Sequence, residues 1–166
     1  MNSQIIVVDD LYDFPHQYHK SFDEGECLIT EETVGKISQI LGHSIQIVEA
    51  SNEMGTDSGV VAHLQCDWIA VIYMTLPLEA FGEMGVRFYS HLPTGLETFP
   101  TDNEMAEYQI DQNELGKVFA SDPELWKEYG CIAAKYNRMI LFKGYRWHSY
   151  NLNNNIRYQK VIINNV

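Results

Sequence analysis

Two histidines and one arginine in this chain have the residue types and the spacing that could form a metal site beside an anion site. His63 and His148 each end a β-like apolar run, and Arg157 follows the second histidine by nine residues, at the start of the last predicted strand. Imidazole nitrogens bind transition metals, and the forked donors of a guanidinium match the two oxygens of a carboxylate. The sequence therefore suggests a metal centre with an anion clamp.

Other interpretations apply to the remaining candidate ligands. A histidine at a strand end is more often a hydrogen-bonded structural residue, and we prefer that interpretation for His16, His19, His43 and His91. Cys66 lies close to His63 in the chain, so a zinc or copper site of His63, Cys66 and His148 is one alternative. The other is that Cys66 is a buried, inert thiol, as lone cysteines beside strands usually are.

Composition and charge predict an ordinary globular protein. The 166 residues include 45% hydrophobic and 20% charged ones, enough to bury a core within one domain. The net charge of -12 leaves no basic surface for a nucleic-acid backbone or an anionic membrane, so we expect neither partner. Three cysteines without CxxC spacing and a start without a signal-like pattern predict a cytoplasmic protein.

The first third of the chain contains both strand and helix patterns. Short β-branched runs predict strands over residues 4–8 and 45–48. Thr30 is the expected N-cap of a helix that ends before Gly42, and Asp13 is the expected cap of a shorter one. The small and polar residues from 51 to 59 predict a loop.

Strand patterns dominate after this loop and favour a β-barrel or a β-sandwich. We predict one domain over residues 1–166, in which residues 1–59 support a barrel core formed by residues 60–166. An insertion over residues 96–136 interrupts that core and holds a short helix, capped by Asp122 with Pro123 at its first position.

At the level of longer motifs, the chain resembles the 2-oxoglutarate and Fe(II)-dependent dioxygenases of the prolyl 4-hydroxylase-like branch, including a microbial and phage group of the same fold. The resemblance spans roughly residues 60–163. It rests on three motifs: Trp68-Ile69-Ala70-Val71-Ile72-Tyr73, Gly85-Val86-Arg87-Phe88-Tyr89-Ser90-His91 with Thr94-Gly95, and Tyr136-Asn137-Arg138-Met139-Ile140-Leu141-Phe142 leading to Trp147-His148-Ser149.

The resemblance implies a mainly β fold with flanking α-helices, a double-stranded β-helix of the jelly-roll, cupin-type barrel kind. It implies His63 and His148 as ligands of Fe(II), with Arg157 and Tyr73 binding the distal carboxylate of 2-oxoglutarate. The implied activity is that of a hydroxylase-type oxygenase, which converts 2-oxoglutarate to succinate while oxidising a small-molecule or peptide substrate.

One position departs from the family pattern. The family places a carboxylate two residues after the first histidine, where this chain has Gln65, and an amide oxygen is a weaker, neutral ligand. Asp67 could supply the carboxylate instead, or Gln65 could coordinate weakly or leave the position open, as in related halogenases. The site could also be lost, which would leave a catalytically silent binding or assembly module. A cupin-type metal enzyme without a keto-acid cosubstrate is a further alternative.

Overall fold

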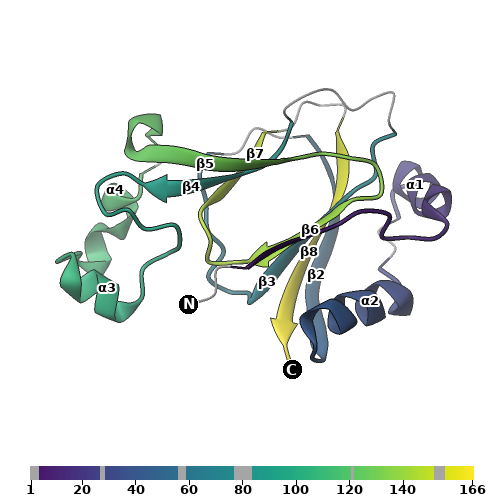
Figure 1. Cartoon of the computed structure of the whole chain (residues 1–166), viewed down its shortest axis with the longest axis horizontal. Coiled ribbons are helices and arrows are strands. Elements are labelled where there is room, and N and C mark those ends of the chain that lie inside the picture. The colour runs from purple at the N-terminus through teal and green to yellow at the C-terminus, as the bar shows by residue number, and fades with distance from the viewer. Residues whose placement is uncertain (1–3, 27–28, 56–58, 77–83, 121, 152–155) are drawn as a thin grey trace.

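The strands form two facing sheets in a computed structural model that describes residues 4–26, 29–55, 59–76, 84–120, 122–151 and 156–166 (Figure 1). The larger sheet has the strand order β1-β6-β3-β8-β2, and the smaller has the order β5-β4-β7. Their bounds are β1 (Ile5–Val8), β2 (Ile45–Met54), β3 (Trp68–Tyr73), β4 (Gly85–His91), β5 (Trp126–Ala133), β6 (Met139–Lys143), β7 (His148–Asn151) and β8 (Arg157–Asn165).

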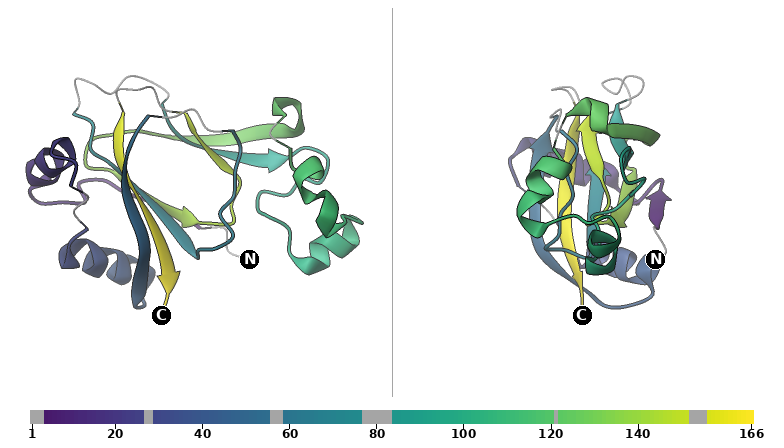
Figure 2. Two further views of the ribbon diagram at one scale, coloured as in Figure 1. Left: turned by 180° about the vertical axis from the view of Figure 1, so that it is seen from behind. Right: turned by 90° about the vertical axis from the view of Figure 1, so that its left-hand side faces the viewer.

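The helices lie at the two ends of this β structure (Figures 1 and 2). At one end are α1 (Pro15–Asp23) and α2 (Glu31–Leu41), and at the other are α3 (Asp102–Glu107) and α4 (Leu115–Val118). Short 3-10 turns span Gln112–Glu114 and Pro123–Leu125. Among the residues that the structure describes, no helix is both long enough and apolar enough to cross a membrane.

The chain alternates between the two sheets in the manner of a jelly roll. It passes from β3 in the larger sheet to β4 and β5 in the smaller, and then through β6, β7 and β8 from one sheet to the other. An antiparallel bridge between Val61 and His148 extends the smaller sheet beyond β7. The protein is therefore a double-stranded β-helix with flanking helices, as predicted.

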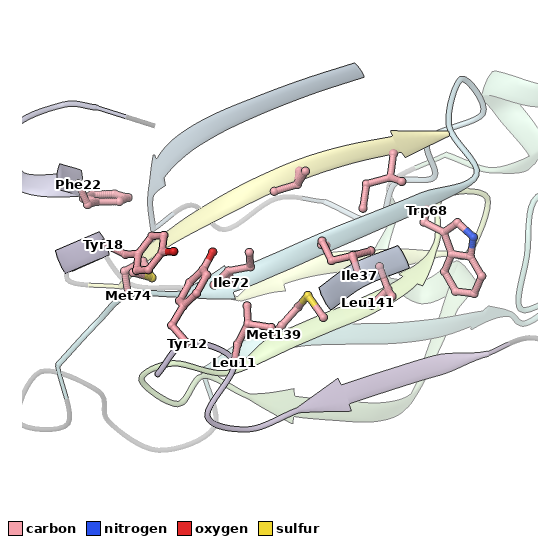
Figure 3. Close-up of a cluster of buried hydrophobic side chains, with 13 residues drawn as sticks. Leu11, Tyr12, Tyr18, Phe22, Ile37, Trp68, Ile72, Met74, Met139 and Leu141 are labelled. Atoms are coloured by element: carbon pink, nitrogen blue, oxygen red, sulfur yellow. The ribbon is translucent and has the colours of Figure 1, made fainter. Parts of the chain in front are cut away.

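Each face of the larger sheet covers a separate hydrophobic core. On the outer face, side chains of β3 and β6 such as Ile72 and Leu141 pack against Tyr12 and against Ile37 of α2 (Figure 3). On the inner face, a second cluster lies between the two sheets and contains Val71, Tyr73, Phe88, Phe142, Tyr150 and Tyr158. Because β3 is buried on both faces, its sequence is continuously apolar rather than alternating.

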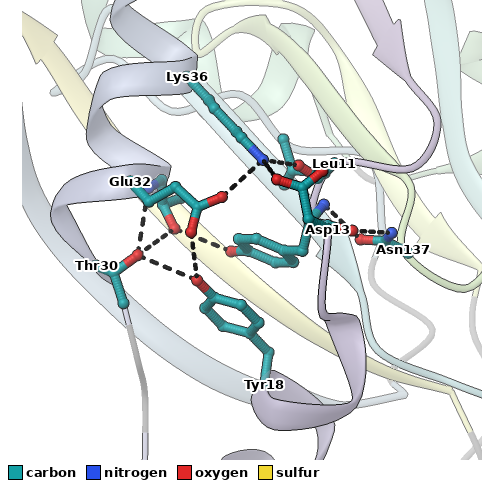
Figure 4. A network of polar contacts seen from close by, with 9 residues as sticks. Leu11, Asp13, Tyr18, Thr30, Glu32, Lys36 and Asn137 are labelled. Carbon is teal, nitrogen blue, oxygen red and sulfur yellow. Dashed lines mark hydrogen bonds and ion pairs between the residues drawn. The ribbon is translucent and has the colours of Figure 1, made fainter.

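A polar network fixes the N-terminal segment to the barrel (Figure 4). Asn137 has a positive φ of 61°, and its side chain accepts from Tyr12 N and donates to Tyr12 O, both at 2.9 Å. The Lys36 ammonium donates to the carbonyl of Leu11 at 2.6 Å. These contacts hold the chain before α1 against both α2 and the turn that precedes β6.

The helix predictions are confirmed at one helix and corrected at the other. Thr30 caps α2, and Gly42 ends it in the left-handed conformation. In α1, by contrast, the N-cap is Phe14, which makes no capping side-chain bond, so the prediction that Asp13 caps this helix was wrong. The carboxylate of Asp13 lies 3.7 Å from the Lys36 ammonium instead.

Two strands extend into the predicted loop over residues 51–59 and the predicted insertion over residues 96–136. The predicted loop over residues 51–59 was wrong at its start, since Ser51 to Met54 continue β2 and pair with β8; residues 56–58 lie outside the described residues. The prediction failed because residues 51–54 show no alternation of apolar and polar side chains, although their backbone pairing with β8 continues. Within the predicted insertion, Asp122 caps the 3-10 turn that begins at Pro123, and β5 follows and pairs with β4.

Candidate metal and anion site

His148 begins β7 and points between the two sheets. It pairs with Phe88 of β4 and is fully buried, with ring centroids 4.8 Å from Phe142 and 5.3 Å from Tyr150. Its Nδ1 lies 2.7 Å from the carbonyl oxygen of Arg146, and because a carbonyl only accepts, Nδ1 carries the proton. Nε2 is therefore a bare acceptor, buried without a hydrogen-bond partner among the described residues.

His63 lies beside His148 although the two are far apart in the sequence. Their ring centroids are 5.5 Å apart and their planes differ by 26°. The Val61–His148 bridge brings the segment before His63 to β7, and the His63 amide donates to the Gly144 carbonyl at 2.7 Å. The structure thus brings the two predicted metal ligands together.

Both imidazoles are held in the neutral form that a metal ligand requires. Burial lowers the pKa of His148 to about 3. Burial also lowers the pKa of His63, and the positive charge of Lys160 adds to that effect. Neither ring therefore needs to lose a proton at neutral pH before binding a cation.

The burial of His148 leads to a pH-dependent stability. Its folded pKa of about 3 lies below that of an unfolded histidine, so the unfolded state binds more protons between the two values. We expect stability to fall as pH drops through this window, by about 2 kcal/mol between pH 7 and pH 5. Urea unfolding at the two pH values measures this, and the loss should shrink in His148→Gln. An equal loss in that variant would assign the acid sensitivity to other groups.

A third protein ligand is not found among the described residues. No group of three His, Cys, Asp or Glu side chains within those ranges could hold a metal ion. Gln65 is exposed, and the carboxylate of Asp67 accepts from the Asn165 amide at 2.8 Å. The Cys66 thiol, whose pKa is raised by burial, lies 3.8 Å from the His63 carbonyl oxygen. The donor set is therefore a pair of imidazoles, which fits two positions of a metal ion.

Gly144 fixes the position of the loop that carries His63. A Cβ atom on Gly144 would lie 2.5 Å from Cys66 Sγ, 2.7 Å from the Cys66 carbonyl oxygen and 2.8 Å from that of His63. Only glycine permits so close an approach of backbone and loop. The turn between β6 and β7 thereby fixes the position of His63 relative to His148.

The two residues expected to bind a keto acid lie on different faces of the larger sheet. Tyr73 is buried between the sheets, its ring 6.4 Å from that of Tyr158, and its hydroxyl faces the backbone amide of Val86 in β4. The Arg157 guanidinium instead donates to Asp23 of α1 at 2.7 Å, on the helix side. The structure therefore does not bring Arg157 to the imidazoles, and its role in binding an anion stays a prediction.

Lys160 is the cation of β8 that faces the interior. It pairs with Val71 of β3, which belongs to the inner core, whereas its neighbour Val161 belongs to the outer core. Paired residues of adjacent strands share a face, so Lys160 points inward. Its ammonium lies 5.9 Å from the ring centroid of Tyr150, and its positive charge lowers the pKa of both His63 and His148. No motif in the sequence marks this residue as part of the site.

Comparisons with known proteins agree with this architecture. A protein-family model described as "Family of unknown function (DUF6445)" matches residues 61–162. No curated protein matches the sequence. Among solved structures, the chain is similar to the non-heme alpha-ketoglutarate-dependent epimerase SnoN from nogalamycin biosynthesis, with 8% identity, a TM-score of 0.56, and coverage of 97% of this chain and 78% of that one.

A second solved structure is similar over the whole fold. HygX from Streptomyces hygroscopicus, with nickel, 2-oxoglutarate and hygromycin B bound, is 8% identical at a TM-score of 0.51, with coverage of 99% of this chain and 83% of HygX. At this identity the likeness establishes the fold and not the activity.

Proposed function

As this chain belongs to the family of unknown function DUF6445 and folds as a double-stranded β-helix with paired interior histidines, we propose that it is a non-haem Fe(II) and 2-oxoglutarate-dependent oxygenase. The prolyl 4-hydroxylase-like branch, suggested by the sequence motifs, is part of this proposal. The solved structures that resemble it include a protein with nickel and 2-oxoglutarate bound, which supports the choice of cofactors.

One observation carries the proposal: the buried Nε2 of His148, which has no partner among the described residues and lies beside a second neutral imidazole. A buried acceptor without a partner costs roughly 1–3 kcal/mol, so such an atom calls for an explanation. Metal-binding histidines commonly donate their other ring N–H to a backbone carbonyl, as His148 does to Arg146. A metal ion is the partner that both features fit.

The chain's own residues would have limited tasks in such a reaction. His63 and His148 would hold the iron. Of the two residues that the sequence predicts for the keto acid, Tyr73 lies between the sheets with them, whereas Arg157 is paired with Asp23 on the other face of the larger sheet. When bound, iron and 2-oxoglutarate would allow molecular oxygen to hydroxylate a C–H bond, with 2-oxoglutarate oxidised to succinate and carbon dioxide. Phe142 and Tyr150 pack edge-to-face against the His148 imidazole and exclude water from it.

The test measures metal and 2-oxoglutarate together. We expect oxygen-free, purified protein to bind Fe(II) in the presence of 2-oxoglutarate and to release succinate slowly when oxygen is admitted. His148→Ala should weaken metal binding by about 100-fold or more, since changes to outer-shell partners alone cost 10–100-fold. His43→Ala, at an exposed histidine, is the matched control and should bind as the native protein does.

A catalytically silent barrel is the second candidate. Exposed Gln65 and the lack of a third protein donor among the described residues favour it. It predicts that the native protein binds neither metal nor 2-oxoglutarate, singly or together, and that Gln65→Asp gains metal affinity. A cupin-type metal enzyme without a keto acid would instead bind metal with an affinity that neither 2-oxoglutarate nor Arg157→Ala changes.

A further inference from the structure

We infer that this site binds its metal ion and an anionic carboxylate ligand cooperatively, and that Lys160 strengthens this coupling. The inference rests on the proposed function and concerns how the same site is filled. It comes from the charge that the described side chains place around the paired imidazoles.

The protein donors at the site carry no negative charge. His63 and His148 are neutral, and the described residues provide no third donor of the His, Cys, Asp or Glu kind. A carboxylate ligand would lower the charge of a bound divalent ion by one, and this chain has the neutral and exposed Gln65 at that position. A metal ion held by this pair alone would keep its full charge inside the barrel.

The ammonium of Lys160 adds to the excess positive charge that a bound metal ion would bring to the site. Lys160 lies on the same inward face as the imidazoles: its ammonium is 5.9 Å from the centroid of the Tyr150 ring, and that ring lies 5.3 Å from the His148 ring. Because like charges repel most strongly where water is excluded, Lys160 opposes the binding of a metal ion alone.

The nearby carboxylates do not remove this charge from the site. Glu49 and Glu53 pair with inward residues of β8, but the Glu53 carboxylate accepts from the Ser51 hydroxyl at 2.7 Å. Glu49 raises the pKa of His63, yet this effect is smaller than the opposite effect of Lys160. Neither carboxylate forms a metal-binding group with the imidazoles among the described residues.

An anion that contacts both the metal ion and the Lys160 ammonium would balance the excess positive charge. A carboxylate on the metal ion would supply the missing negative ligand, and a second carboxylate would neutralise Lys160. The Lys160 ammonium already lies near the Tyr150 ring, which packs edge-on against the His148 ring. The ligand class is thus a short dicarboxylate with an additional metal-binding oxygen, for which 2-oxoglutarate is the probe.

Calorimetry on the native protein tests the coupling directly. Ni(II) and 2-oxoglutarate are titrated separately, and then each in the presence of the other. We expect each to raise the affinity of the other by the same factor of at least about 10, because the coupling free energy is reciprocal. Succinate, which lacks the keto oxygen, should give a smaller factor.

Lys160→Met separates this inference from a general loss of the site. Removing the ammonium should strengthen the binding of Ni(II) alone and weaken that of 2-oxoglutarate, two effects of opposite sign that a misfolded variant cannot produce. Lys127→Met removes the same charge from an exposed position on β5 and should change neither. Gln65→Asp should strengthen the binding of Ni(II) alone and reduce the coupling.

The possible failures are distinguishable. If Ni(II) binds the native protein equally well with and without 2-oxoglutarate, the inference is overturned while the proposed function stands. If 2-oxoglutarate affinity is lost in Arg157→Met and unchanged in Lys160→Met, Lys160 does not bind the anion and the inference is also overturned. If neither probe binds, alone or together, the proposed function itself fails.

Discussion

Gly144→Ala is expected to destabilise the protein by roughly 3 kcal/mol, at the upper end of the usual cost of overpacking. The new methyl group would lie 2.5 Å from Cys66 Sγ and within 2.8 Å of two carbonyl oxygens, so the loop from His63 to Cys66 would have to move. Two backbone hydrogen bonds hold the same loop against Gly144. The His63 amide donates to the Gly144 carbonyl, and the Gly144 amide donates to the Asp67 carbonyl. Displacement of His63 from His148 should follow.

Urea unfolding and Ni(II) titration with 2-oxoglutarate present measure the two consequences. Gly35→Ala is the matched control, because a Cβ atom there meets nothing within 4 Å and the residue lies inside α2. That variant should gain about 0.5–1 kcal/mol, the usual advantage of alanine over glycine in a helix. An unfolding midpoint for Gly144→Ala equal to that of the native protein would show that the loop adapts without cost.

The fold could be predicted because its main elements are local patterns. The continuous apolar run of β3 reflects burial on both faces, and Thr30 and Gly42 mark the ends of α2 by their capping chemistry. β2 was underestimated because the polar residues Ser51 and Glu53 pair with β8 at the sheet edge. Residues 51–54 are at best partly buried on both faces, so this end of the strand lacks the alternation of apolar and polar residues on which strand prediction depends.

The orientation of β8 could not be predicted from its sequence. From Ile156 onward, both of the alternating sets of residues include apolar side chains. Each set also includes one cation, Arg157 in one and Lys160 in the other. The pairing of Lys160 with Val71 decides which cation faces inward, and this contact joins distant parts of the chain. Spacing from His148 alone therefore could not identify the inward residue.

The third ligand position depends on contacts that are equally remote in sequence. Asp67 was a plausible ligand in the sequence, but the backbone amide of Asn165 at the end of β8 binds its carboxylate. Gln65, two residues earlier, is left exposed. The paired histidines were easier to foresee, since each one lies at the end of an apolar run.

Phe142→Ala is expected to cost roughly 3–5 kcal/mol, the usual cost of truncating a fully buried phenylalanine. Phe142 makes edge-to-face contacts with Phe88 and His148, at centroid distances of 5.3 and 4.8 Å. Its loss would open a cavity directly beside the His148 ring. Because a domain of this size has only about 5–15 kcal/mol of stability, the variant should remain folded but with a small margin.

The neighbouring position separates packing of the site from packing of the fold. Leu141 is equally buried but faces the helices, so Leu141→Ala should lose a comparable 2–5 kcal/mol without touching the imidazoles. We expect Phe142→Ala to lower the affinity for Ni(II) in the presence of 2-oxoglutarate by about 10-fold, as loss of support for a metal ligand does. Leu141→Ala should leave that affinity unchanged. Equal losses of Ni(II) affinity in the two variants would mean that the position of His148 depends on the stability of the whole barrel and not on its contact with the Phe142 ring.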